Sequence, residues 1–195
     1  MRSLEAKRIG KKIYEILRFP TSQLLNYSTT QPLCVNAMKY TVGVSDMKLS
    51  TAAGDVIVTH ALGSCIGVAI HDPQSNVGGI LHYMLPMSSV DTGKAEQNPF
   101  MFGDTGIPRL FEEAYKLGAK KENLRVVIAG GAQVFEDRDF FDIGKRNTVI
   151  ARKLFWKNNI LIAAENVGGH LPRTMYLEVG EGTTYFTSRG ERSEL

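Results

Sequence analysis

The sequence has little cysteine and no long apolar run, and both absences narrow the class of protein. Its 195 residues contain only two cysteines, Cys34 and Cys65. Two are too few for a disulfide-stabilised scaffold and are typical of a reducing compartment. No stretch approaches the roughly 18 apolar residues that a membrane-spanning helix needs, and no apolar segment follows the basic first residues as a secretory signal requires. We therefore expect a cytoplasmic protein in which Cys65 is free for chemistry.

Most of the chain also lacks a basic excess. The net charge is +3, but residues 1–37 alone carry six basic and two acidic side chains. The remainder has 17 basic and 18 acidic residues, which gives no reason to expect nucleic acid as a partner. Neither a Cys-x-x-Cys pair nor a Gly-Lys-Ser/Thr signature is present. We therefore expect neither a metal nor a cofactor.

The composition divides the chain into an N-terminal extension at 1–37 and a single domain at 38–195, which is long enough for one core. Apolar residues of the extension follow a loose helical spacing until Pro20, and a polar segment follows. Three interpretations of the extension stay open. It is a mobile tail, a basic amphipathic helix that contacts a partner or an anionic surface, or sequence that precedes a true start at Met38.

Within the domain, runs rich in Val and Ile predict strands at 40–44, 56–60, 65–72 and 77–85. Further strands are predicted at 124–129, 160–165, 174–179 and 184–188, the last two as a hairpin. Helical periodicity predicts helices over 104–117, capped by Asp104 or Thr105, and over 144–157. The fold class is therefore α/β in the α+β sense: a layered sandwich of mixed β-sheets with hairpins, flanked by two or three helices.

A long segment at 86–103 shows few helix or strand signals, and we predict a loop there. It contains Phe100, Met101 and Phe102. These side chains either contact a partner or cover a substrate, or they pack into the core.

Cys65 and His82 are expected to lie near each other. The sequence Asp72-Pro73-Gln74-Ser75-Asn76 is a strong turn signal, so the strands on either side of it should form a hairpin. Cys65 stands about nine residues before the centre of this turn and His82 about eight after it, which places them at the same end of the ladder.

A cysteine at a tight turn with a histidine on the next strand can act as a thiol nucleophile and its general base. Thr59, at the end of the preceding strand, can orient the imidazole, and backbone N–H groups at Gly63 and Ser64 can stabilise an oxyanion. The competing interpretation is that Cys65 is a small buried apolar residue, because free cysteine is commonly buried.

A zinc site formed by Cys65, His82, His60 and His71 is a further alternative. The spacing disfavours it, since residues that alternate along a strand point to opposite faces of the sheet.

The chain also resembles the CheD family of chemoreceptor glutamine deamidases over about residues 40–190. The motifs that carry this resemblance are Thr59-x5-Cys65 with Leu62-Gly63-Ser64-Cys65, His82-x-Met84-Leu85-Pro86, Ile128-Ala129-Gly130-Gly131-Ala132-x-x-Phe135, Ile143-Gly144-x-Arg146-Asn147 and Gly168-Gly169. The resemblance implies a Cys65–His82–Thr59 triad and a fold similar to the catalytic domain of the cytotoxic necrotizing factor toxins. It implies conversion of receptor glutamine side chains to glutamate, without cofactor or metal.

The implied partners are the cytoplasmic helices of methyl-accepting chemotaxis receptors and a CheC-type phosphatase. One departure from the family pattern lies next to the site: His60 stands where the family commonly has leucine, and Ala61 where it has glycine. The triad is intact, and a stiffer turn and a more polar site are the expected consequences. No family counterpart is expected for residues 1–37.

Two alternatives to the deamidase stay open. One is a non-catalytic or dual-use partner that stimulates a CheC-type phosphatase. The other is a thiol hydrolase of another class, such as a peptidase or a transglutaminase-like enzyme, which would share the acyl-thioester step.

Overall fold

The computed structural model describes residues 37–133 and 142–195. The N-terminal extension, with its three interpretations, lies outside the described residues, as does Phe135 of the family motif. Two five-stranded sheets make up the described fold. The first has the order β1 (Lys39–Val42), β3 (Val56–Leu62), β8 (Arg173–Glu178), β9 (Thr184–Ser188) and β10 (Glu191–Glu194). The second has the order β2 (Asp46–Ser50), β5 (Val77–Tyr83), β4 (Ile66–Asp72), β6 (Arg125–Gly130) and β7 (Ile162–Val167).

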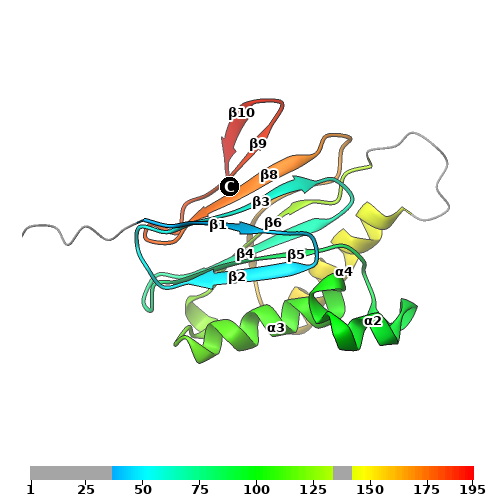
Figure 1. Ribbon diagram of the computed structural model, residues 1–195, viewed down its shortest axis with the longest axis horizontal. Helices are drawn as coiled ribbons and strands as arrows, with labels where there is room; N and C mark the ends of the chain where they lie inside the picture. The colour runs from blue at the N-terminus through cyan, green and yellow to red at the C-terminus, as the bar shows by residue number, and fades with distance from the viewer. Residues whose placement is uncertain (1–36, 134–141) are drawn as a thin grey trace, which may run out of the picture. The chain divides into compact units, whose positions relative to one another are not determined.

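Both sheets are mixed. In the first sheet β1 pairs with β3 in parallel, and in the second β6 pairs with β7 in parallel. All other neighbours described are antiparallel. Two helices, α3 (Gly103–Lys116) and α4 (Ile143–Lys157), cover one face of the second sheet (Figure 1). The prediction of a mixed α+β fold with hairpins and few helices is therefore confirmed.

Two apolar clusters hold the layers together. One fills the space between the second sheet and the helices and includes Leu81, Leu110 and Phe155. The other fills the space between the two sheets and includes Ile57, Ile80 and Met175. The central strands β5, β4 and β6 of the second sheet are thus buried on both faces, which explains why they read as almost continuous apolar runs.

Strand β4 shows how the sequence separates its two faces. Ile66, Val68 and Ile70 point towards the helices, whereas Gly67 and Ala69 point towards the first sheet. The sheets approach closely at Gly67, where a Cβ atom would lie 2.8 Å from a side-chain atom of the facing strand β3. Small residues on this face therefore allow the two sheets to pack against each other near the end of β4 that begins at Ile66.

The hairpin between β4 and β5 is confirmed. The Asp72 carboxylate accepts hydrogen bonds from the backbone N–H groups of Gln74 (2.8 Å) and Ser75 (3.3 Å), which is the local reason for the turn. Asn76 completes it in the left-handed conformation, with φ of 53°. The resulting register pairs Gly67 with His82.

The prediction of a loop at 86–103 is wrong. This segment contains the 3₁₀-helices η1 (Ser88–Val90) and η2 (Pro99–Met101) and the short helix α2 (Thr92–Gln97), which is capped by the Asp91 carboxylate. No residue of α2 is buried, so the sequence carries no apolar periodicity there. Phe102 is completely buried and Phe100 packs on the helix-side cluster, which favours the core interpretation of these side chains.

The predicted caps of α3 are also wrong. Its N-cap is Phe102, which provides no side-chain hydrogen bond. The Asp104 carboxylate instead accepts hydrogen bonds from the backbone N–H and hydroxyl of Ser88, each at 2.8 Å. The Thr105 hydroxyl donates to the Pro99 carbonyl at 2.6 Å. Both side chains therefore fix the preceding 3₁₀ segments onto the helix rather than cap it.

Besides η1, α2 and η2, three further elements were not predicted: the strands β2 and β10 and the 3₁₀-helix η3 (Lys121–Asn123). The helix predicted over 144–157 begins at Ile143, and the strand predicted over 160–165 is shifted to Ile162–Val167.

Candidate functional site

Cys65 lies at the start of β4, on the face of the second sheet that packs against the first. It directly precedes β4 and stands two residues before Gly67, the partner of His82 in the adjacent strand. Its side chain contacts the apolar cluster between the two sheets. Because residues two apart in an extended chain share a face, Cys65 and His82 lie diagonally on the same face of the hairpin. The fold thus places these two predicted residues on the same face of neighbouring strands.

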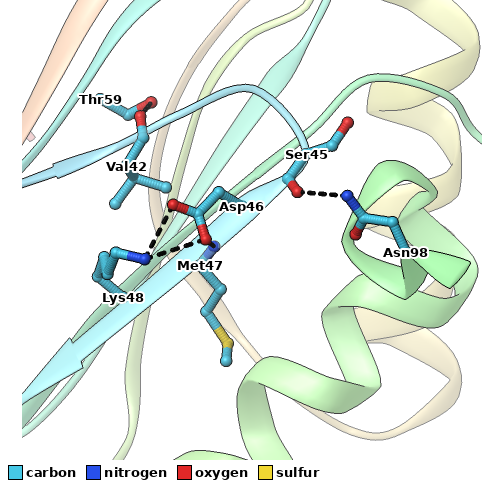
Figure 2. Close-up of polar contacts among 7 residues, drawn as sticks. All are labelled: Val42, Ser45, Asp46, Met47, Lys48, Thr59 and Asn98. Atoms are coloured by element: carbon cyan, nitrogen blue, oxygen red, sulfur yellow. Dashed lines mark hydrogen bonds and ion pairs between the residues drawn. The ribbon is translucent and has the colours of Figure 1, made fainter.

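His82 is fixed from the facing sheet. The Thr59 hydroxyl of β3 lies 2.8 Å from Nδ1 of His82 and 3.0 Å from the Val42 carbonyl of β1. Figure 2 shows the contact between Thr59 and Val42 across the two parallel strands. Both Thr59 and His82 are completely buried. The predicted orienting role of Thr59 thus has a matching contact. The Val42 carbonyl is a further hydrogen-bond partner of Thr59, which the sequence did not reveal.

These contacts determine which nitrogen of the imidazole carries the proton. A hydroxyl has a single hydrogen, and Thr59 donates it to the Val42 carbonyl. The contact with His82 therefore requires Nδ1–H as donor and the Thr59 oxygen as acceptor. Neutral His82 then has an unprotonated Nε2, which is buried and has no hydrogen-bond partner among the described residues. Its lone pair is free to accept a proton.

Burial keeps both reacting groups neutral at rest. It lowers the pKa of His82 to about 4, because the charged imidazolium is poorly solvated between the sheets. It also raises the pKa of the Cys65 thiol, which is partly buried. No hydrogen bond joins Cys65 to His82 in this conformation. The site therefore contains a thiol and a free base, rather than a preformed thiolate–imidazolium pair.

The turn that leads into Cys65 contains a β-bulge. The pairing of β3 with β8 changes register between Thr59 and Leu62, and Ala61 within this bulge has a φ of 56°. That left-handed conformation favours glycine, which explains why a glycine suits the position and why Ala61 costs about 1 kcal/mol there. The left-handed φ of Ala61 is the backbone feature on which the predicted stiffness of this turn would depend.

Gly63 and Ser64, the two residues proposed for the oxyanion site, differ in the hydrogen bonding of their backbone N–H groups. The Gly63 N–H already donates to the Ala61 carbonyl at 2.8 Å. The N–H groups of Ser64 and Cys65, by contrast, donate to no other described residue in the backbone contacts of this turn. The geometry therefore favours Ser64 and Cys65 over Gly63 as donors to a developing negative charge.

The Gly130-Gly131 pair supports the turn from β6. The N–H of Gly131 donates to the Cys65 carbonyl at 2.8 Å, and the N–H of Ala132 donates to the Gly63 carbonyl at 2.7 Å. A Cβ atom at Gly130, where φ is 112°, would lie 2.2 Å from the Cys65 carbonyl oxygen. These glycines therefore allow a close backbone approach to the cysteine turn.

Asn147 is a site neighbour for which sequence reasoning gave no role. Its side-chain amide donates to the carbonyls of Ser64 and Met84, each at 2.9 Å. The side chain comes from α4 and is completely buried. A polar residue on the apolar face of a helix was the available signal, although its partners lie 83 and 63 residues away in sequence.

The other histidines are not part of the site. His60 is exposed on β3, and His71 lies at the opposite end of β4, where its Nε2 donates to the Val179 carbonyl at 2.8 Å. Within 37–133 and 142–195, no three His, Cys, Asp or Glu side chains are grouped as metal ligands would be. None of the helices described there is both long and apolar enough to cross a bilayer.

Fold and site together define an α+β protein with two packed mixed sheets and a cysteine–histidine–threonine cluster between them. Comparison with known proteins identifies the family more narrowly. The family model described as CheD chemotactic sensory transduction matches residues 84–188, more than half of the chain. The chain belongs to the CheD family. The matched range begins two residues after His82, so the three residues of the cluster precede it.

Relatives cover more of the chain. A protein of Syntrophus aciditrophicus named "Probable chemoreceptor glutamine deamidase CheD 1" is 52% identical over 149 residues, which are 76% of this chain and 93% of that protein. A similarly named protein of Solibacter usitatus is 47% identical over 154 residues, 79% of this chain and 91% of that one. Another, of Thermococcus kodakarensis, is 36% identical over 147 residues, 74% of this chain and 89% of that one.

One solved structure, a Neisseria meningitidis protein of the DUF152 family, is 10% identical with a TM-score of 0.38. The match covers 69% of this chain and 60% of that protein, and a similarity at this level carries no argument about the fold.

Proposed function

We propose that this protein is a chemoreceptor glutamine deamidase, a protein-glutamine glutaminase that converts receptor glutamine side chains to glutamate and releases ammonia. The observation that carries the proposal is the arrangement of His82, whose Nδ1–H is held by Thr59 and whose free Nε2 lies on the face shared with Cys65. The names of the CheD relatives supply the substrate class.

In the first half of the reaction, Nε2 of His82 takes the proton of the Cys65 thiol. The resulting thiolate attacks the side-chain amide carbon of a glutamine and forms a tetrahedral intermediate. Its negative oxygen is stabilised by the backbone N–H groups of Ser64 and Cys65. Thr59 accepts the Nδ1–H throughout, so that the proton gained at Nε2 creates an imidazolium with a fixed orientation.

In the second half, His82 returns its proton to the amide nitrogen, the carbon–nitrogen bond breaks, and ammonia leaves. The acyl group stays on Cys65 as a thioester. His82 then removes a proton from water, the hydroxide attacks the thioester carbon, and the carbon–sulfur bond breaks to give glutamate and the free thiol. The side chains of Cys65, His82 and Thr59 account for every proton transfer and bond change in these steps, so the proposal includes no cofactor and no metal.

The partners follow from the same proposal. The substrates are glutamines on the cytoplasmic helices of methyl-accepting chemotaxis receptors, and the protein works in the cytoplasm. Residues 38–195 form the catalytic domain, similar to that of the cytotoxic necrotizing factors, and residues 1–37 precede it as an extension. A CheC-type phosphatase is a second partner in this proposal.

The test is a deamidation assay on purified receptor cytoplasmic fragments. Peptide mass spectrometry follows the small mass increase that accompanies replacement of an amide by an acid at individual glutamines. We expect wild type and the control Cys34→Ser to produce this change and Cys65→Ala to produce none. Activity in Cys65→Ala would rule out Cys65 as the nucleophile.

The same assay separates the alternatives. If wild type modified no receptor glutamine but stimulated a CheC-type phosphatase, the non-catalytic partner would replace the deamidase. If an added primary amine became attached to the glutamine in place of hydrolysis, transglutaminase-like chemistry would be the better description, because the amine would then compete with water for the thioester.

A further inference from the structure

We propose that Asn147 is a positioning residue, which holds the cysteine turn and the end of the histidine strand in the relative placement that the reaction needs. This inference rests on the proposed function for its catalytic consequence. Its structural basis is one amide group that bonds to the backbone on both sides of the site.

The two hydrogens of the Asn147 amide have different destinations. One is donated to the carbonyl of Ser64, the residue directly before Cys65, and the other to the carbonyl of Met84, two residues after His82. Both distances are 2.9 Å. The side chain therefore joins the two strands of the hairpin at the end where Cys65 and His82 lie. Without it, both carbonyls would lose this partner.

The helix that carries Asn147 is itself fixed to the site. The Tyr83 hydroxyl donates to the backbone carbonyl of Asn147 at 2.6 Å. One turn earlier, a Cβ at Gly144 would lie 2.6 Å from the carbonyl oxygen of Gly131, which shows how closely the helix packs on the turn that bonds to Cys65. The first turns of α4 thus contact the cysteine turn from one side and β5 from the other.

The amide is completely buried, and its Oδ1 atom has no partner among the described residues. An orphaned acceptor is costly in a protein interior, so the position is not optimal for stability alone. Its burial also means that Asn147 does not touch a substrate. The effect on the reaction is therefore exerted through the backbone at Ser64 and Met84, which sets the distance between Cys65 and His82.

The experiment compares Asn147→Ala and Asn147→Asp with wild type and with Phe155→Leu. Phe155 is buried on the same helix but packs on the helix-side cluster, away from Cys65, so this control lowers stability without touching the site. Asn147→Asp keeps the shape of the side chain and cannot donate to both carbonyls, which covers the case in which the alanine variant fails to fold. Thermal midpoints are measured for all variants, and reactivity is compared well below them.

Two readouts are used. The first is deamidation of receptor fragments, for which we expect kcat/KM to fall about 100-fold in both Asn147 variants, the scale of a small misplacement of reacting groups. The second is iodoacetamide alkylation of Cys65, resolved from Cys34 by peptide mass spectrometry. A released turn exposes the thiol, so the alkylation midpoint should move towards lower pH and the rate at neutral pH should rise by up to about tenfold per pKa unit.

Phe155→Leu should show the wild-type alkylation profile. An Asn147 variant with wild-type alkylation and wild-type kcat/KM would overturn the inference. The same holds if Phe155→Leu shifted the profile equally, because the effect would then reflect stability alone. If wild type deamidated nothing while the Asn147 variants still shifted alkylation, the proposed function would fail and the positioning role of Asn147 would stand.

Discussion

Thr59→Val tests the arrangement on which the proposed mechanism depends. The substitution keeps a β-branched side chain of nearly the same shape in β3, so the strand is preserved. It removes the hydroxyl that lies 2.8 Å from Nδ1 of His82 and 3.0 Å from the Val42 carbonyl. A buried imidazole N–H and a backbone carbonyl are then left without partners, at a cost of about 1 to 3 kcal/mol each in an apolar interior.

The cost to catalysis follows from the same hydrogen bond. It orients the ring, selects the tautomer with a free Nε2, and is strengthened when His82 becomes an imidazolium in the transition state. A loss of about 1.4 to 2.8 kcal/mol in transition-state stabilisation corresponds to about a 10- to 100-fold decrease in kcat. Thr59→Ser is the matched control, since it keeps the hydroxyl and should retain most of the activity.

The assay is single-turnover deamidation of a receptor fragment at saturating enzyme, followed by peptide mass spectrometry. ¹⁵N chemical shifts of His82 give an independent check, with Nδ1 protonated and Nε2 unprotonated in wild type at neutral pH. Equal rates for Thr59→Val and Thr59→Ser would refute the orienting role of the hydroxyl. A protonated Nε2 in wild type would refute the tautomer itself.

Three further predictions concern pH and backbone conformation. Because burial lowers the pKa of His82 to about 4, folded His82 stays neutral where unfolded histidine takes up a proton. Stability is therefore lost as pH falls from about 6.5 towards 4, and wild type should lose about 2 kcal/mol more than His82→Gln between pH 7 and pH 5 in urea unfolding; equal losses would contradict the buried neutral imidazole. Gly130→Ala should destabilise the protein by about 2 kcal/mol more than Gly190→Ala, since both have positive φ but only Gly130 faces the Cys65 carbonyl; equal thermal shifts would count against that close approach. Ala61→Gly should stabilise by roughly 0.5 kcal/mol in the same assay, as relief of the left-handed conformation outweighs the entropy of glycine; a destabilised variant would show that Ala61 is unstrained.

The sequence was sufficient for the central hairpin because its signals are local. The Asp72 turn sets the register, and the register alone aligns Gly67 with His82. Cys65 then shares a face with His82 through simple strand alternation. Strand β2 escaped prediction because it is a short, polar edge strand, in which only Met47 and Leu49 pack on the helix-side cluster.

The missing parts of the site depend on contacts that are distant in sequence. Thr59 was a candidate from the sequence, but its second contact, with the Val42 carbonyl of β1, depends on the pairing of distant strands, which no local pattern specifies. The role of Asn147 is hidden for the same reason, because its partners are backbone carbonyls of other elements and carry no residue signature. The sequence showed only that Ala61 stands where the family commonly has glycine, and alanine itself gives no local signal for the left-handed φ that it adopts.

The burial of the site explains how the two halves of the proposed reaction are kept apart. Cys65 is partly buried, whereas His82 is completely buried, so a substrate is expected to reach the sulfur before its amide nitrogen reaches the imidazole. The low pKa of His82 makes its imidazolium a strong acid, which in the proposed mechanism readily returns its proton to the leaving nitrogen. Water has to reach the buried Nε2 for the second half. Because His82 is completely buried, it is poorly placed to activate water in the free enzyme, which in the proposed mechanism favours acyl transfer through Cys65 over direct attack of water on the amide.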